Sequence, residues 1–170
     1  QSGDQGPIDR GSRPAGHLRL VEGRFPEEAA CVQALGEGFD LFISKNTLKK
    51  GYVHPEREVD PRRLLGLKVS DAEFVAAVAR LMKPGGLVMI YNICPAPSPP
   101  DQPYIPWADG RCPFPRQVWE SAGFEVLTFD RDDSPDVRKM AHLLKWDQGE
   151  GAMDLEQDLF AMYSLFRREE

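Results

Sequence analysis

The stretch FDLFISKNTLKKGYVHP, residues 39–55, changes character halfway along its length. Its first part holds consecutive apolar residues from Leu41 to Ile43, a pattern typical of a strand that is covered on both faces. Six of the seven residues from Ser44 to Lys50 are then polar or charged. In open α/β sheets, ligands bind just beyond the carboxyl ends of the strands. This stretch therefore predicts a strand over 39–44 that ends at a binding site.

A helix and a second strand follow. Ser70 and Glu73 form a capping-box pattern, and apolar residues recur at helical spacing over 74–82. The turn KPGG, residues 83–86, ends this helix, and LVMIYNI, residues 87–93, is again apolar on both faces. A strand, a helix and a strand in this order predict a crossover connection between two parallel strands.

The rest of the chain supports an α/β fold. Patterns of apolar residues and caps predict strands at 17–23, 124–130 and 158–168, and helices at 25–36, 116–123 and 134–146. The first sixteen residues hold four glycines and two prolines. We expect residues 1–16 to be a disordered arm or a remnant that is not native, and residues 17–170 to form a single α/β domain.

A proline-rich segment, residues 94–115, holds eight of the fifteen prolines of the chain. Neither a helix nor an interior strand tolerates that density. A long loop without secondary structure in a compact domain is usually functional or disordered. The aromatic residues Tyr104, Trp107 and Phe114 favour an ordered loop, which could close over a ligand or cover one face of the sheet.

Composition narrows the classes of function. The net charge of −6 argues against a dedicated nucleic-acid-binding protein, which would present a basic face. No window holds about 18 uninterrupted apolar residues, so no membrane span is expected. The three cysteines are widely spaced and favour a cytoplasmic location without disulfides. No spacing of histidine and cysteine fits a structural zinc site, so no metal is expected.

The order of these elements resembles the carboxyl-terminal part of a class I S-adenosylmethionine-dependent methyltransferase. The resemblance spans roughly residues 17–168 and is carried by FDLFISKNTL (39–48), LMKPGGLVMIYN (81–92), SAGFEVLTFD (121–130) and LFAMYSLF (159–166). Strands in that family follow the order 3-2-1-4-5-7-6, with the seventh antiparallel. The resemblance implies a Rossmann-like methyltransferase sheet that is truncated, mostly parallel and closed by a C-terminal antiparallel strand.

Two motifs of the family have no counterpart in this sequence. They are the glycine-rich loop after the first strand, where the backbone must approach the cofactor closely, and the acidic residue that ends the second strand. Without those two strands, the apolar strand at 39–44 becomes an exposed edge that invites pairing. Residues 18–22 would then pair beside it, another subunit would cover it in a homo-oligomer, or the chain would be a fragment of a longer protein.

The resemblance places candidate site residues at the strand ends. It implies a cofactor site for S-adenosylmethionine, with Asn46 near the transferred methyl group. His54 is a candidate general base. A plain polar turn or a solvated loop would explain the same residues. The candidates for cofactor binding are Gly23, Arg24, Phe25, Ser44 and Asn46, and those for acceptor binding are Lys49, Tyr52, Tyr91, Asn92, Tyr104, Trp107 and Arg111.

The function implied by the resemblance is methyl transfer from S-adenosylmethionine to an unidentified small-molecule acceptor, in the context of a longer protein. The chemistry consists mainly of aligning two reactants. The absent glycine loop keeps a second interpretation open, a non-catalytic α/β module for interaction or oligomerisation.

Overall fold

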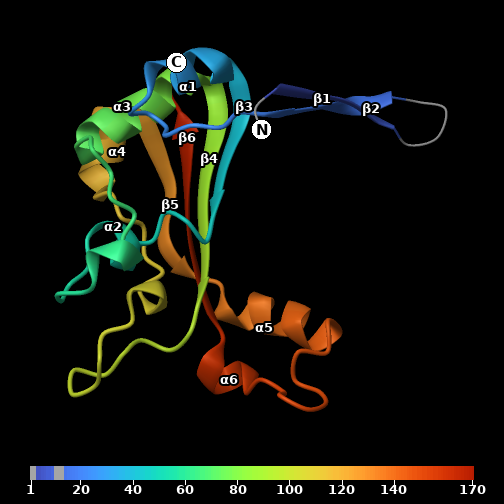
Figure 1. Ribbon diagram of the computed structural model, residues 1–170, viewed down its shortest axis with the longest axis vertical. Helices are drawn as coiled ribbons and strands as arrows, with labels where there is room; N and C mark the ends of the chain where they lie inside the picture. Colours follow the sequence, from blue (N-terminus) through green and yellow to red (C-terminus); the bar gives the residue numbers. More distant parts are fainter. Residues whose placement is uncertain (1–2, 10–13) are drawn as a thin grey trace.

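The computed structural model describes residues 3–9 and 14–170, with side chains from residue 16 onward (Figure 1). Its strands are β1 Gly3–Asp9, β2 Pro14–Leu20, β3 Phe39–Lys45, β4 Met82–Cys94, β5 Phe124–Asp132 and β6 Phe160–Arg168. Its helices are α1 Ala29–Leu35, α2 Lys50–Val53, α3 Asp71–Leu81, α4 Arg116–Ser121, α5 Ser134–Leu143 and α6 Leu155–Asp158, with 3-10 turns η1 Pro61–Arg63 and η2 Pro106–Ala108.

The central sheet has four strands in the order β3-β4-β6-β5. β3 and β4 are parallel, joined by the crossover through α3 that the sequence predicts. β6 runs antiparallel to both of its neighbours, β4 and β5. The sheet is therefore mixed, and the α/β fold with a C-terminal antiparallel strand is confirmed.

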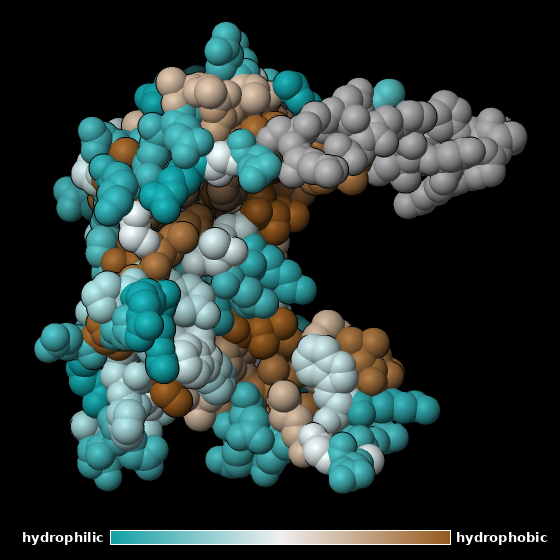
Figure 2. Space-filling model, in the orientation of Figure 1, coloured by the Kyte–Doolittle hydropathy of each residue, from teal (hydrophilic) through white to brown (hydrophobic). Residues whose placement is uncertain are grey.

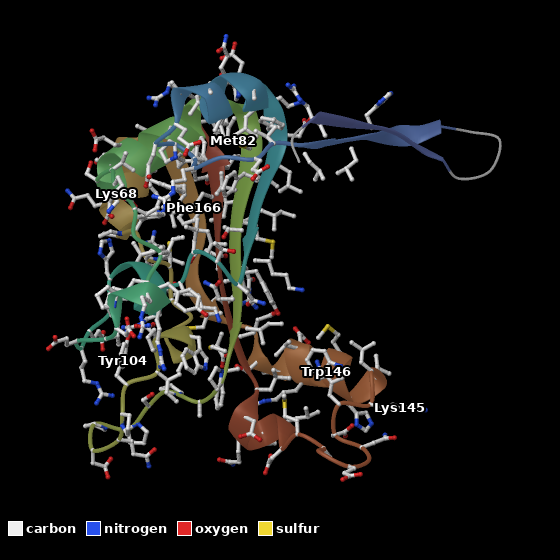
Figure 3. All side chains as sticks on the ribbon, viewed as in Figure 1. Lys68, Met82, Tyr104, Lys145, Trp146 and Phe166 are labelled. Carbon is white, nitrogen blue, oxygen red and sulfur yellow. The ribbon has the colours of Figure 1, made fainter. Side chains whose placement is uncertain are left out.

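One face of the sheet carries the main core, under α3 and α4. The predicted capping box starts α3: the Ser70 hydroxyl accepts from the Glu73 amide, and the Glu73 carboxylate accepts from the Ser70 amide at 2.8 Å. The fully buried Trp119 of α4 stacks on Phe166 of β6 with ring centroids 4.0 Å apart. This aromatic packing joins the helix layer to the sheet, where Figure 3 labels Phe166.

The opposite face is covered only at its carboxyl end in the described part of the chain, where Val137 and Ala141 of α5 pack beside Tyr91. Farther along this face, Leu41 is 50% and Ile43 57% exposed. The expectation that both faces of 39–44 are covered is therefore wrong. In the described part of the chain, no helix covers this part of the face, and β3 is also the edge strand of the sheet, paired on one side only.

The amino-terminal residues form a hairpin in place of the disordered arm expected over 1–16. β1 pairs with β2 in an antiparallel ladder, and both project away from the sheet (Figure 1). Because β2 pairs with β1, residues 18–22 do not insert beside β3. Residues 1–2 and 10–13 of the expected arm lie outside the described residues.

Apolar side chains gather around the uncovered face. Figure 2 shows hydrophobic surface in the concavity between the hairpin and α5. An exposed apolar strand edge is a ready template for pairing with another chain. Large exposed side chains on the hairpin, β3 and the α5 region are Leu18, Leu20, Phe39, Leu41, Ile43, Met140, Leu143, Leu144, Trp146 and Met153.

We expect the 170-residue chain by itself to self-associate through β3. Light scattering after gel filtration should show a species larger than the monomer whose fraction rises with concentration. Ile43→Lys should shift it towards monomer, because a charge on the edge opposes pairing. Gln33→Lys on the exposed surface of α1 is the control. A monomer at every concentration, with rapid amide exchange over 39–44, would contradict this expectation.

In the described residues, no helix is both long enough and apolar enough to span a membrane.

Candidate functional site

Two pockets lie over the carboxyl ends of the strands. The register pairs Phe42 with Val88 and Ser44 with Ile90, so these four side chains share the face that carries α3. A pocket of about 690 Å³ is lined from β3, and one of about 650 Å³ from β4, β5 and β6. Both volumes suit a small ligand or cofactor. Two pockets therefore lie at the sheet edge where the opening stretch predicts a binding site, and a third, of about 780 Å³, lies between α5 and α6.

The pocket beside β3, which we call the first pocket, brings together four of the five predicted cofactor residues. Gly23, Arg24 and Phe25 line it from the segment before α1, and Ser44 lines it from β3. The Ser44 hydroxyl accepts a hydrogen bond from the Leu48 amide at 3.2 Å, so it also shapes the turn after the strand. The sequence prediction that these distant segments meet is consistent with this geometry.

Local packing explains the shape of the segment 23–25 where it lines the first pocket. Phe25 packs edge-on against Phe74 of α3, with ring centroids 5.7 Å apart. Gly23 has φ +152°, and a Cβ there would lie 2.8 Å from Cβ of Cys31 in α1. A glycine is thus required for the chain to turn this close to the helix. Arg24 is left exposed at the pocket, 3.7 Å from Glu27.

Asn46 ends the pairing between β3 and β4. It has φ 60°, a conformation that asparagine adopts more readily than most residues. Its backbone amide donates to the Tyr91 carbonyl at 3.0 Å, and its side-chain Oδ1 accepts from the Ile93 backbone amide at 2.7 Å. With Tyr52 it lines a smaller pocket of about 240 Å³ next to the first pocket. The side-chain oxygen of Asn46 thus holds the strand ends together.

Lys49 is a structural anchor. Its buried Nζ donates to the carbonyls of Ile93 at 2.6 Å and Trp107 at 3.2 Å. Burial lowers the pKa of this lysine, and the nearby Cys94 opposes that effect. The ammonium group joins the end of β4 to the proline-rich loop, and it does not line either large pocket.

The pocket under the proline-rich loop, which we call the second pocket, is closed by an ordered segment. Arg57 fastens the loop by donating to the carbonyls of Pro99, Pro100 and Gln102 at 3.3, 3.2 and 2.9 Å. Its guanidinium also lies over the ring of Tyr104, 5.1 Å from the centroid. Figure 3 shows Tyr104 on the loop side of the molecule, beside α2.

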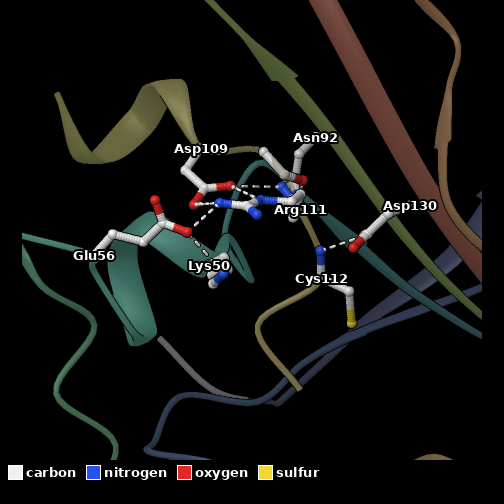
Figure 4. A network of polar contacts seen from close by, with 8 residues as sticks. Lys50, Glu56, Asn92, Asp109, Arg111, Cys112 and Asp130 are labelled. Atoms are coloured by element: carbon white, nitrogen blue, oxygen red, sulfur yellow. Dashed lines mark hydrogen bonds and ion pairs between the residues drawn. The ribbon is translucent and has the colours of Figure 1, made fainter. Parts of the chain in front are cut away.

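A charged network fixes the inner part of this loop (Figure 4). Arg111 donates to both carboxylate oxygens of Asp109, at 2.8 and 2.7 Å, and to Glu56 at 2.7 Å. Lys50 donates to the same Glu56 oxygen at 3.0 Å. The guanidinium and the lysine lower the pKa of Glu56, so this carboxylate is charged at neutral pH. Arg111, expected to bind the acceptor, thus has its Nε and Nη2 held by the protein.

Asn92 joins the two loops from inside. It is fully buried, and its Nδ2 donates to the carbonyls of Leu48 at 2.8 Å and Gly110 at 2.9 Å. Its side chain shares the sheet face of the second pocket but does not line that pocket. Its position therefore couples the turn after β3 to the loop after β4.

Three other predicted site residues lie away from both large pockets. His54 pairs with Asp71 at the start of α3, 2.8 Å apart. Tyr91 lies on the opposite face of the sheet and donates to Asp133 at 2.8 Å; burial and that contact raise its pKa. Trp107 is 38% exposed and packs under the guanidinium of Arg63. The geometry does not bring these three together with the pocket residues.

Sequence reasoning missed several residues that line the second pocket. Asp132 ends β5, Ser134 begins α5, and Phe160 and Met162 belong to β6, so all four reach the pocket from segments distant in sequence from the proline-rich loop. The position of Asp132 at the carboxyl end of a strand is the signal that could have found it. Cys94 also lines the pocket, but burial raises the pKa of its thiol and leaves it a poor nucleophile.

The described residues contain no cluster of three or more metal-ligating side chains. Their three cysteines are free and buried.

No protein-family model matches the sequence, and no curated protein sequence matches it either. Among solved structures, the chain is similar to the [4+2]-cyclase SpnF, at 15% identity and TM-score 0.35, over 79% of this chain and 51% of that one. It is also similar to phosphoethanolamine N-methyltransferase 2 from Haemonchus contortus in complex with S-adenosyl-L-methionine, at 11% identity and TM-score 0.36. That match covers 78% of this chain and 34% of the other.

A third structure, described as a sarcosine dimethylglycine methyltransferase from Galdieria sulphuraria, matches at 12% identity and TM-score 0.33. The match covers 79% of this chain and 54% of that protein. The chain thus spans about half or less of the length of the structures it matches, and these likenesses are too distant to assign a family.

Proposed function

We propose that this chain contributes the carboxyl-terminal half of an S-adenosylmethionine-dependent methyltransferase, within a longer protein that completes the cofactor site. The observation that carries the proposal is the sheet. The order β3-β4-β6-β5, with β3 and β4 parallel and the last strand reversed between β4 and β5, reproduces strands four, five, seven and six of the class I pattern. The agreement of both strand order and strand direction with this pattern supports the proposal.

The described residues fit one side of the cofactor. Phe25 and Arg24 offer an aromatic ring and a cation to an adenine at the first pocket. Among the described residues, no glycine-rich loop after a strand and no acidic strand end lines the first pocket to hold the methionine and ribose parts. We therefore assign this chain the adenine side and the acceptor side, and we assign the remaining contacts to the longer protein.

In this proposal the cofactor lies at the first pocket and the acceptor in the second pocket. The bound donor supplies a methyl group on a positively charged sulfur; the acceptor lone pair forms the new bond, and the carbon–sulfur bond leaves its electron pair on sulfur. The chain's own contribution is alignment and exclusion of water. The loop held by Arg57 and Arg111 forms the wall, and Asn46 and Asn92 fix the strand ends between the two pockets.

The uncovered face of β3 supports a second candidate function, an interaction module without catalysis. Leu41 and Ile43 present an apolar edge that another chain could cover. This candidate predicts a stable complex through β3 and no turnover of S-adenosylmethionine by any form of the protein.

Turnover by a longer form tests the proposal. That form, incubated with S-adenosylmethionine and a panel of acceptors, should produce S-adenosylhomocysteine, measured by chromatography. Arg111→Gln should lower turnover about tenfold or more without changing cofactor affinity, because it loosens the acceptor wall. Arg116→Gln removes a surface pair with Glu120 and a contact with the ring of Phe129, both outside the two pockets, and is the matched control. No turnover with any acceptor, despite bound cofactor, would favour the interaction module.

A further inference from the structure

The second pocket combines an apolar body with a negatively charged rim. Its walls come from prolines of the loop, the ring of Phe160 and the thioether of Met162. Three carboxylates and two guanidinium groups line the same space. Such a pocket selects ligands by the sign of their charge as well as by their shape. Its charged lining residues are Glu56, Arg57, Asp109, Arg111 and Asp132.

Both guanidinium groups are already bound by the protein. Arg111 donates to Asp109 and Glu56, and its pKa is raised by these contacts, Asp109 first. Arg57 donates to three loop carbonyls and lies over the Tyr104 ring. Two of the three carboxylates are compensated in the same network. The pocket therefore has little positive charge to offer an anionic ligand.

Asp132 is the carboxylate left to a ligand. Its Oδ1 accepts from the Ser134 amide at 2.9 Å and from the Ser134 hydroxyl, and these bonds lower its pKa. Among the described residues, nothing donates a hydrogen bond to its Oδ2. The serine thus holds one oxygen in place at the rim of the pocket and leaves the other for a donor group.

We propose that the second pocket binds an amine with an apolar body, its nitrogen at Asp132 and its body against Phe160 and Met162. The inference rests on the proposed function in naming this amine as the methyl acceptor, whereas its binding does not depend on methyl transfer. A bound ammonium group must lose a proton before its nitrogen can attack. That proton passes to water, because the lowered pKa of Asp132 makes this carboxylate a partner that holds the ammonium group and a poor base.

Isosteric ligands of different charge test the site on the 170-residue chain without any cofactor. Phenethylamine, 2-phenylethanol and phenylacetate share an aromatic body and differ in their polar end. Titration calorimetry should show the amine binding at least tenfold more tightly than the alcohol, and the carboxylate not at all. The preference should weaken as salt is added, since the rim is open to solvent. Equal affinities for the three ligands, or a preference for phenylacetate, would overturn the proposal.

A substitution then assigns the preference to one oxygen. Asp132→Asn keeps an oxygen for the Ser134 bonds and removes the charge, so it should cost the amine about tenfold in affinity and leave the alcohol unchanged. Asp136→Asn removes the same charge from α5 outside the pocket and is the control. If both variants lose affinity equally, only net charge matters and the site is wrong. Thermal unfolding of each variant verifies the fold.

The methyl-transfer step needs its own measurement. A longer form that turns over S-adenosylmethionine should methylate the amine, detected by mass. Binding without methylation would remove the amine from the proposed reaction and leave the amine site standing. Methylation of other acceptors with no amine binding would overturn the amine site and leave the proposed methyl transfer standing.

Discussion

Titration of S-adenosylmethionine into the 170-residue chain is expected to show weak binding or none, whereas a longer form that supplies the glycine loop should bind it well. The described residues offer Arg24 and Phe25 to the adenine and little to the rest of the cofactor. Three or four missing hydrogen bonds at about 0.5–1.5 kcal/mol each amount to about 2–6 kcal/mol. At about 1.4 kcal/mol per tenfold, affinity should fall by roughly 30- to 20,000-fold.

Calorimetry on both forms, with S-adenosylmethionine and S-adenosylhomocysteine, measures this difference. Phe25→Leu in the longer form should weaken binding by a few-fold, since it removes only the stacking ring. Val118→Leu, on α4 and remote from the first pocket, is the control for folding. Micromolar binding by the 170-residue chain would mean that another segment replaces the glycine loop, and our account of the cofactor site would be wrong.

Gly51→Ala is expected to release the proline-rich loop from α2. Gly51 is buried, and a Cβ on it would overlap the carbonyl oxygen of Pro106 in η2. The same contact region holds backbone bonds from Lys50 to Arg111, 2.9 Å, and from Gly51 to Asp109, 3.3 Å. Overpacking together with the loss of these bonds should destabilise the protein by about 2–4 kcal/mol. Because the loop forms a wall of the second pocket, amine binding should fall with it.

Two measurements follow this variant. Its melting temperature should drop by about 5–15 °C, and limited proteolysis should now cut within 95–112 faster than anywhere else after residue 20. Gly66→Ala is a matched control, because a Cβ there meets no atom within 4 Å. It should be neutral or slightly stabilising. A Gly51→Ala protein that melts and resists protease like the wild type would show that the loop is not fastened at this contact.

Local chemistry in the sequence is enough to predict most of the elements. The capping box between Ser70 and Glu73, residues only three apart in the sequence, sets the start of α3. Consecutive apolar residues in 87–93 require a strand with two covered or half-covered faces, and they lie in β4. The parallel pairing of β3 with β4 follows from the length and helical pattern of the connection between them. These features depend on neighbours in sequence, so the sequence alone shows them.

The boundaries and the covered faces depend on distant parts of the chain. Nothing local shows that the sheet face carrying Leu41 and Ile43 is exposed, because that depends on whether a distant element packs over this face. Likewise, the segment predicted as a strand at 17–23 ends at Leu20, since its partner is β1. Strand pairing is a choice among alternatives far apart in sequence, and the sequence pattern is compatible with several of them.

The candidate site divides in the same way. Position after a strand was sufficient to suggest Ser44, Asn46 and Asn92, because the carboxyl ends of parallel strands meet at one edge of the sheet. The roles of these residues came only from tertiary contacts: the Asn46 side-chain oxygen accepts from the amide of Ile93 in β4, and the Asn92 side chain donates to carbonyls of two loops.

Lys49 and Asp132 show the physical reason why the roles of site residues depend on the tertiary structure. Lys49 looks like a ligand-binding cation in the sequence, yet folding buries its ammonium between two carbonyls, where hydrogen bonds replace lost water. Asp132 looks like one of many acidic residues, yet folding brings its free oxygen to an apolar pocket built from β4, β6 and the loop. The sequence determined which chemical groups are present at the strand ends. Only the tertiary structure decided which of them are used up by the protein and which remain free for a ligand.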